Sequence, residues 1–215
     1  MHIKACLFDL DGVIVDTAKY HYLAWKELAE RLGFEFTEAQ NERLKGVSRM
    51  ASLNILLEIG NIRASETEKI QMTNNKNKRY LEFIEQMQPD EILPGVLSFL
   101  ESLKKAGIKA AIGSASKNAP GIIEKLQISH FFDAIIDGNT VTNAKPNPEV
   151  FLKGALALNV LPSECVVFED AASGIEAALN GGMKCIGVGH SEILQNADLV
   201  ISGFINFSID RLMEL

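Results

Sequence analysis

Short apolar runs alternate with longer segments of helical character along the chain, and this alternation restricts the possible folds more than any other feature. The apolar runs comprise residues 3–9, 108–114, 134–136, 165–169, 185–188 and 199–201. Helical segments between them include residues 95–106, 117–126, 148–158 and 171–180. Strands that alternate with helices of crossover length form parallel sheets covered by helices. The sequence therefore predicts an α/β fold.

One stretch breaks the alternation, because residues 17–87 contain no convincing strand. Apolar side chains recur there at the spacing of one helix face, beginning with Tyr22, Trp25, Leu28, Ala29 and Leu32. A chain of 215 residues suits one full domain plus a smaller one. We therefore expect an α/β core of residues 1–16 and 88–215, with residues 17–87 inserted as a small helical domain. The connections would lie near residues 13–16 and 90–94.

Charge and hydropathy restrict the partners and the compartment. Lysine and arginine total 21 against 28 acidic residues, a net charge of −7, which disfavours nucleic acid and membrane surfaces as partners. The apolar runs are far shorter than the roughly 20 residues that span a bilayer, and Asp9 interrupts the first too early for a signal peptide. We expect a cytoplasmic monomer. Its three cysteines, Cys6, Cys165 and Cys185, lie in apolar runs and are expected to be reduced core residues.

Acidic side chains follow two of the predicted strands. Asp9 and Asp11 end the first run, and Glu169 and Asp170 end the run that begins at Cys165. Ligand sites in parallel sheets open at the carboxyl ends of the strands, so we expect the four carboxylates to converge. Such a cluster tolerates its own repulsion when a hard cation binds, and oxygen ligands alone favour Mg²⁺. Alternatively, the first pair belongs to a turn and the second caps the following helix.

Two further segments would bind an anion at the same edge. Ser114 ends the second predicted strand, directly before a helix, where hydroxyls and backbone amides favour phosphate. Lys145 lies in a polar loop before a predicted helix, and its ammonium would balance the charge of a phosphoryl group. Ser116 and Asn118 have an alternative role as helix caps, and a lone loop lysine is usually solvated.

This ordered set of residues resembles the haloacid dehalogenase superfamily. Its phosphotransferases use a D-x-D loop, a Ser or Thr after the second strand, a Lys and a closing acidic pair. The resemblance covers the whole chain and implies a Rossmann-like parallel core with an inserted helical cap at residues 17–87.

Further motifs resemble the β-phosphoglucomutase branch of that superfamily. They comprise residues 8–13, Asp16-Thr17, Tyr20-His21, Ala24-Trp25-Lys26, the segment 44–49, the segment 114–118 and Gly187-Val188-Gly189. The resemblance implies that Asp9 is the nucleophile, which becomes an aspartyl phosphate, and that Asp11 is the general acid and base. One Mg²⁺ would be held by Asp9, the Asp11 carbonyl, Glu169 and Asp170.

The same resemblance implies a small sugar phosphate as partner, with glucose 1,6-bisphosphate as intermediate and activator. Lys145, Ser114 and Asn118 would hold the phosphate beside Asp9, while Arg49, Ser116 and Lys117 would hold the distal phosphate. Gly46 and Val47 would line the sugar, and His21 and Lys76 would couple the cap to Asp11. The remaining residues expected at the substrate are Thr17, Trp25 and Ala115.

Two rival functions stay open at this point. A sugar-phosphate or phosphoglycolate phosphatase of the same superfamily would keep Asp9, Asp11, Lys145 and Asp170 but pass the phosphoryl group to water. A nucleotide-binding module without turnover would use the fold alone. The second is disfavoured because the sequence has no G-x-x-x-x-G-K-[ST] loop, and Gly187-x-Gly189 lacks the third glycine of a dinucleotide site.

Overall fold

The computed structural model describes residues 3–44 and 47–215, and its central element is a six-stranded parallel sheet. In the order β3-β2-β1-β4-β5-β6, the strands are Ala134–Ile136, Lys109–Gly113, Ala5–Phe8, Cys165–Glu169, Lys184–Val188 and Leu199–Ile201. Strand β1 is central, and Ala5 pairs with Lys109 of β2 on one side and Cys165 of β4 on the other. The predicted α/β class is confirmed.

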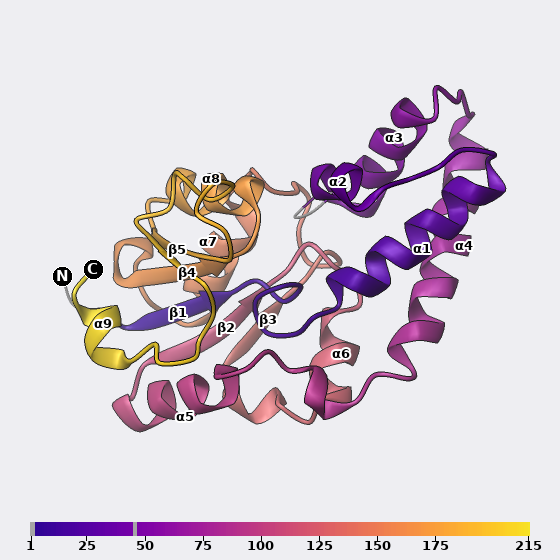
Figure 1. Ribbon diagram of the computed structural model, residues 1–215. Helices are drawn as coiled ribbons and strands as arrows, with labels where there is room; N and C mark the ends of the chain where they lie inside the picture. Colours follow the sequence, from indigo (N-terminus) through magenta and orange to yellow (C-terminus); the bar gives the residue numbers. More distant parts are fainter. Residues whose placement is uncertain (1–2, 45–46) are drawn as a thin grey trace.

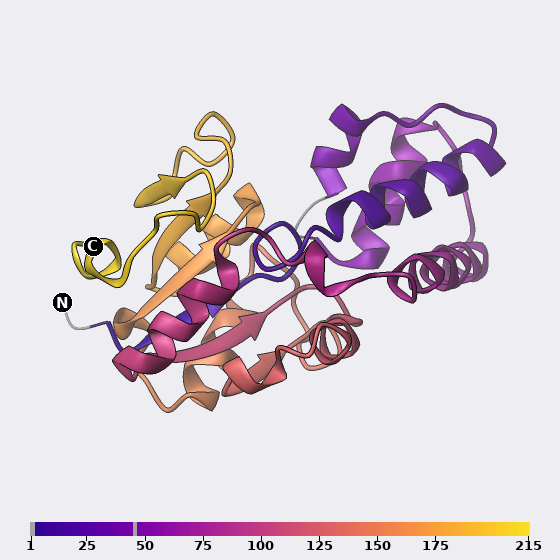
Figure 2. The same cartoon turned by 60° about the horizontal axis from the view of Figure 1, so that its bottom comes forward.

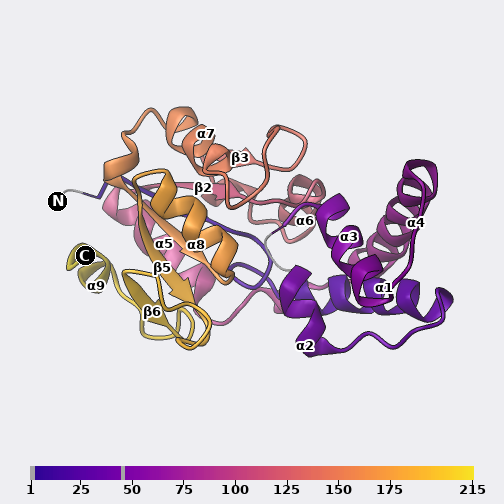
Figure 3. The ribbon, with the colours of Figure 1, turned by 90° about the horizontal axis from the view of Figure 1, so that it is seen from above.

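The sheet separates two hydrophobic layers, and β1 contributes to both because successive side chains of a strand point to opposite faces. Cys6 and Phe8 pack in the layer of α5 (Val96–Ala106), α6 (Ala119–Lys125) and α9 (Ile209–Met213). Ala5 and Leu7 pack in the layer of α7 (Glu149–Ala157) and α8 (Ala172–Asn180). Helices therefore cover both faces of the sheet (Figures 1 and 3). The three cysteines are buried and unpaired, as predicted.

Short 3-10 helices lie in three of the connections of the core: η2 (Pro89–Glu91), η3 (Ser129–Phe131) and η4 (Pro162–Glu164). Helix α5 begins after Gly95 and ends before Gly107, both in the left-handed region at φ +85° and +71°. Glycine adopts this conformation without strain, which explains why the chain turns sharply at both ends of that helix.

Between β1 and β2 lie helices that form a separate group, here called the cap helices: α1 (Ala18–Arg31), α2 (Glu38–Asn41), η1 (Glu42–Leu44), α3 (Arg49–Ile59) and α4 (Glu66–Ile84). They stand apart from the sheet in Figures 1 and 2 and enclose their own cluster, which includes Trp25, Phe36, Leu53 and Leu56. A capping box of Ser65 and Glu68 begins α4. In the described part of the chain, no helix is long and apolar enough to cross a bilayer.

The two connections between the cap helices and the core run side by side and hydrogen-bond to each other. The Asp16 N–H donates to the Glu91 carbonyl at 3.2 Å, and the Leu93 N–H donates to the Ile14 carbonyl at 3.0 Å. The Tyr20 hydroxyl at the start of α1 donates to the Glu91 carboxylate at 2.6 Å. The expected division at residues 16/17 and 87/88 stays a prediction.

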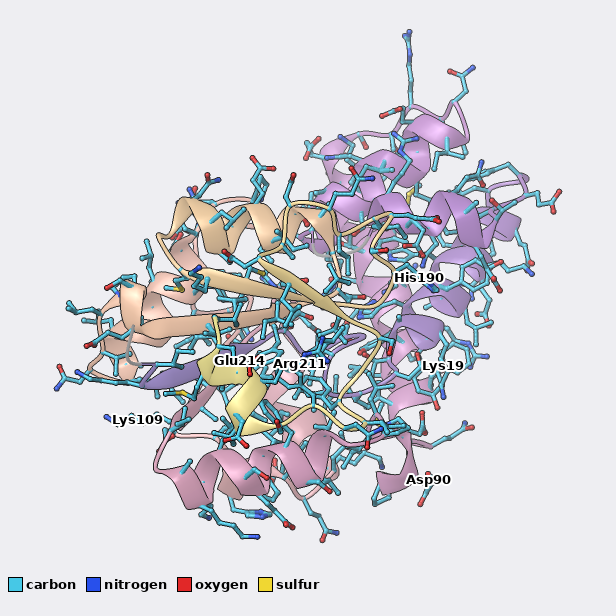
Figure 4. All side chains as sticks on the ribbon, turned by 60° about the vertical axis from the view of Figure 1, so that its left-hand side comes forward. Lys19, Asp90, Lys109, His190, Arg211 and Glu214 are labelled. Carbon is cyan, nitrogen blue, oxygen red and sulfur yellow. The ribbon has the colours of Figure 1, made fainter. Side chains whose placement is uncertain are left out.

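The carboxyl ends of the strands face the cap helices. In Figure 4, Lys109 at the amino end of β2 lies at one end of the molecule. His190, just beyond β5, and Lys19 at the start of α1 lie toward the cap helices. The sequence positions that follow β1, β2 and β4 are therefore brought to the junction between core and cap.

Candidate active site

A buried ion cluster lies at the carboxyl ends of β1 and β4. The Lys145 ammonium is 2.5 Å from Oδ1 of Asp9 and 2.6 Å from Oε1 of Glu169. Burial alone would lower the pKa of Lys145, but the two carboxylates outweigh it and raise that pKa above its ordinary value. Burial also raises the pKa of Glu169, which Lys145 opposes. Lys145 therefore supplies a fixed positive charge beside Asp9.

Two glycines allow the acidic side chains to approach the loops around them. Gly12 has φ +82°, and a Cβ there would overlap the Asp170 carboxylate. A Cβ on Gly174, in the first turn of α8, would overlap the carboxylate of Glu169. Any larger residue at either position would displace the neighbouring acid.

The oxygen donors at this edge suit a hard cation in kind, because Asp9, Asp170 and the main-chain carbonyl of Asp11 contribute no nitrogen or sulfur. Glu169, expected as another ligand, has different contacts: Oε1 accepts from Lys145, and Oε2 accepts from the Ala171 N–H at 2.9 Å. In the regions that the structure describes, no group of three or more Asp, Glu, His or Cys side chains is already gathered around one point. The donors fit Mg²⁺, and the role of Glu169 as a further ligand stays a prediction beside its contact with Lys145.

Asp11 is poised to exchange a proton near neutral pH. Its N–H donates to Oδ2 of Asp9 at 2.9 Å, and its Oδ1 accepts from the Thr17 hydroxyl. Burial, followed by the charge of Asp9, raises the pKa of Asp11 to about 7, while Lys76 and Lys145 oppose the increase. A group with this pKa is available both as an acid and as a base.

His21 and Lys76 bring the cap helices to Asp11. The Lys76 ammonium lies 2.7 Å from Nδ1 of His21 and packs on the rings of Trp25 and Tyr80, at 4.6 and 4.9 Å from their centroids. Burial and the neighbouring cations lower the pKa of both His21 and Lys76 well below the ordinary values. A charged ammonium can only donate, so when Lys76 is charged Nδ1 accepts and the His21 proton is on Nε2, which lies 3.9 Å from Oδ1 of Asp11.

Two serines organise the loop after β2. The Ser116 N–H donates to Oγ of Ser114 at 3.0 Å, and the Asn118 N–H donates to Oγ of Ser116 at 3.2 Å. Both hydroxyls thus act as acceptors, and neither donates its own proton to a described residue. The side chain of Asn118 donates to Oδ1 of Asn77 on α4 at 3.0 Å, a direct contact between core and cap. The hydroxyl protons of Ser114 and Ser116 are therefore available to donate to a bound anion.

A cavity of about 450 Å³ lies between the cap helices and the core, within the range of small-molecule sites. Most of the residues predicted from the sequence line it together: Asp9, Asp11, His21, Trp25, Val47, Arg49, Lys76, Ser114, Ala115, Ser116, Lys117, Lys145 and Asp170. Residues separated widely in the sequence therefore line one cavity.

Three predicted residues have a different position. Thr17 is fully buried beneath Asp11, Glu169 lies beneath Lys145, and Asn118 faces α4. They support residues of the cavity and do not line it. Gly46 lies outside the described residues.

Other lining residues carried no recognisable signal in the sequence. The cap helices contribute Asn41, Leu44, Ser52 and Thr73, and the core contributes residues 141–144. They reach the cavity only through tertiary packing, so no local pattern marks them. Tyr80 does not line the cavity but packs against Lys76 and His21, and it has a usable signal, since it follows Lys76 by four residues and shares its helix face.

Comparison with known proteins places this geometry in a family. The model of the haloacid dehalogenase-like hydrolase family matches residues 6–188. The chain belongs to this family. The match includes the D-x-D loop, Ser114, Lys145 and the closing acidic pair, and confirms the superfamily that the sequence resembles.

Several members of the haloacid dehalogenase-like hydrolase family are similar over nearly the whole chain. A β-phosphoglucomutase of Bacillus subtilis is 42% identical over 214 residues, covering 99% of this chain and 95% of that protein. The solved structure of a β-phosphoglucomutase from Clostridium difficile is 44% identical with a TM-score of 0.94, covering 99% of this chain and 96% of the other. A phosphorylated carbohydrates phosphatase of Thermotoga maritima is 35% identical over 193 residues, covering 88% of this chain and 87% of that protein.

Proposed function

We propose that this protein is a β-phosphoglucomutase, which interconverts β-glucose 1-phosphate and glucose 6-phosphate through β-glucose 1,6-bisphosphate. The observation that carries the proposal is that one cavity presents more cationic and hydroxyl groups than a single phosphate requires. Ser114 and Lys145 accompany Asp9, while Arg49 and Lys117 line the same cavity from α3 and from the loop after β2. A bisphosphate needs two such groups, whereas hydrolysis of a monophosphate needs one. The similarity to the two β-phosphoglucomutases supports this function.

In one half of the reaction, Asp9 takes a phosphoryl group from β-glucose 1,6-bisphosphate. A carboxylate oxygen of Asp9 attacks phosphorus, the bond between phosphorus and the sugar oxygen breaks, and that oxygen receives a proton from Asp11. Lys145 offsets negative charge on the transferring oxygens, so positioning and electrostatics supply most of the rate. In the other half, the free 6-hydroxyl of β-glucose 1-phosphate loses its proton to Asp11 and attacks the aspartyl phosphate. The bond between phosphorus and the Asp9 oxygen breaks, which frees Asp9 and gives the bisphosphate, and the bisphosphate turns end for end before Asp9 takes its other phosphoryl group. A bisphosphate present in trace amounts would load Asp9 and activate the enzyme.

Magnesium would complete this site. Asp9, Asp170 and the main-chain carbonyl of Asp11 are the donors that we propose for it, and Glu169 would fix Lys145. When bound, Mg²⁺ would neutralise charge on the phosphoryl oxygens.

A mutase must keep water from the aspartyl phosphate. The His21–Lys76 pair reaches Asp11 from the cap helices, so a change in cap position would move it relative to the acid. We propose that a bound sugar phosphate favours the position in which Asp11 is productive, and that water alone does not. The enzyme would act as a cytoplasmic monomer on this small sugar phosphate.

The second candidate function is a phosphatase acting on phosphorylated carbohydrates, favoured by the similarity to the Thermotoga maritima protein. Both functions share Asp9, Asp11 and Lys145, so these residues do not separate them. The two functions differ in the acceptor of the phosphoryl group, which is a sugar hydroxyl in the mutase and water in the phosphatase.

The test incubates the purified protein with Mg²⁺, β-glucose 1-phosphate and a trace of glucose 1,6-bisphosphate. Glucose 6-phosphate is measured with a coupled dehydrogenase, and inorganic phosphate is measured in parallel. We expect glucose 6-phosphate to form at the rate of substrate loss. Stoichiometric release of inorganic phosphate without glucose 6-phosphate would establish the phosphatase instead.

A further inference from the structure

The cap side of the cavity carries neutral polar side chains to which the proposed mechanism gives no role. Asn41, Ser52 and Thr73 line the cavity, and their exposed fractions are 8%, 4% and 6%. They come from three different cap helices, α2, α3 and α4. None carries a charge, so this part of the wall differs from the cationic groups suited to phosphate.

The hydroxyls of two of these side chains donate hydrogen bonds within the cap helices. The Thr73 hydroxyl donates to the carbonyl of Ile70 at 2.9 Å, and the Ser52 hydroxyl donates to the carbonyl of Leu44 at 3.4 Å. Their oxygens keep lone pairs and act toward the cavity as acceptors.

Asn41 is different, because its carboxamide has no hydrogen-bond partner among the described residues. Its backbone is held, since the Asn41 N–H donates to the carbonyl of Thr37 at 3.1 Å and a capping box of Thr37 and Gln40 begins α2. Its carboxamide is not among the fully buried side-chain groups that lack a partner, so it is open to a molecule in the cavity. A molecule bound in the cavity is therefore the available partner of the Asn41 carboxamide.

The group that would pair with Asn41 is a hydroxyl. A carboxamide offers both a donor and an acceptor, which matches the donor and acceptor of a hydroxyl, and it offers no charge to a phosphate. The neighbouring Ser52 and Thr73 oxygens also accept from hydroxyls. A substrate with several hydroxyl groups would therefore satisfy this wall, and a substrate without them would leave Asn41 unpaired.

We propose that Asn41 determines specificity by hydrogen-bonding one hydroxyl of the substrate sugar from the cap side. This inference rests on the proposed sugar-phosphate function and names the part of the substrate that is recognised. A site built to pair a polar group rejects an analogue that lacks it more strongly than an apolar pocket rejects a small change.

The first test compares Asn41→Ala with wild type on β-glucose 1-phosphate and on its 2-, 3- and 4-deoxy analogues. Wild type should lose about ten- to hundred-fold in kcat/KM on one analogue, because the amide stays unpaired. Asn41→Ala should lose a similar factor on the parent sugar and almost nothing further on that analogue. Asn54→Ala, an exposed asparagine of α3, is the matched control and should retain the wild-type pattern.

A second measurement needs no turnover. Trp25 is the single tryptophan and lines the cavity, so its fluorescence reports binding. Asn41→Ala should weaken the binding of β-glucose 1-phosphate by about ten-fold and leave the binding of inorganic phosphate unchanged. Asn41→Leu, which keeps the number of side-chain heavy atoms and removes both polar groups, should show the same selective loss of binding and should not lower the Tm of the free protein.

Equal losses on the parent sugar and every deoxy analogue would overturn the inference, because they indicate a structural role. An equal loss in the affinity for inorganic phosphate would also overturn the inference. If wild type forms no glucose 6-phosphate but the fluorescence titrations still show the selective loss, the proposed mutase activity fails while the role of Asn41 stands.

Discussion

The ammonium of Lys145 lies 2.5 Å from Oδ1 of Asp9, although 136 positions separate the two residues in the chain. Both side chains are buried, at 1% and 8% exposed, so water screens their attraction little. Asp9 thus remains close to a permanent cation before any substrate enters. This arrangement suits a carboxylate that must accept a phosphoryl group from an anion.

Lys145→Ala is expected to abolish phosphorylation of Asp9 and to lower the free energy of unfolding by about 3–5 kcal/mol, because Asp9 and Glu169 would be left without their cation. Urea denaturation measures the second effect. Lys153→Ala is the control, since Lys153 pairs with Glu149 at the surface of α7 and contributes at most about 0.5 kcal/mol. A small, equal change in both variants would contradict the buried cluster.

The pH dependence should follow Asp11, whose pKa is raised to about 7, chiefly by burial. The acid must carry its proton when the sugar oxygen leaves, so phosphorylation of Asp9 by a sugar phosphate should fall as pH rises through about 7. Rapid-quench measurement of phosphoenzyme checks this expectation. In Asp11→Asn the slow residual rate should lose that dependence; an unchanged profile would assign the titration to another group.

The same shift affects stability with a defined sign. The folded state holds the Asp11 proton more tightly than the unfolded chain, so stability is lost as pH rises from the ordinary carboxyl range to about 7. Asp11→Asn removes this loss. Its gain in unfolding free energy should therefore be larger at pH 8 than at pH 5, and a gain that is independent of pH would refute the shift.

Gly174→Ala should reduce activity by at least about ten-fold, because the new methyl group would occupy the place of the Glu169 carboxylate and release Lys145. Gly121→Ala on α6 is the matched control. Its Cβ would meet no atom within 4 Å, so it should stabilise the helix by about 1 kcal/mol. Adding Glu169→Asp, which is one methylene shorter, should partly restore Gly174→Ala; a double variant with additive losses would argue against this contact.

Arg49→Ala should weaken the use of glucose 1,6-bisphosphate by about ten- to hundred-fold and hydrolysis of a small phosphate ester by much less, because only the bisphosphate needs a second phosphate group bound. Steady-state kinetics on both substrates measures the difference. Arg63→Ala, an exposed arginine beyond α3, should change neither. Equal losses on both substrates would show that Arg49 does not bind the distal phosphate.

The sequence was sufficient for the parts of the fold that local chemistry determines. Buried parallel strands produce uninterrupted apolar runs, and polar residues end them, so β4 and β6 were located to the residue. The same rule predicted that Asp9, Ser114 and Asp170 would share one edge of the sheet, and they line one cavity.

The remaining features depend on packing between distant segments. Asn41 lines the cavity because of how α2 lies against the other cap helices, and nothing in its neighbours in the chain indicates this. The end of an apolar run predicted Glu169 at this edge of the sheet but did not indicate its partners. Its contacts with Lys145 and the Ala171 N–H depend on the space left by Gly174, which only the tertiary structure displays.

The pairing of β1 has a consequence for biosynthesis. Both of its partners come late, since Ala5 pairs with Lys109 and with Cys165. A ribosome must therefore synthesise all the cap helices before β1 has any neighbour, and most of the chain before it has two. The cap helices have their own apolar cluster and precede both partners. We expect them to collapse first during translation, while an unpaired, wholly apolar strand waits at the amino terminus, the period in which this chain is most prone to aggregate.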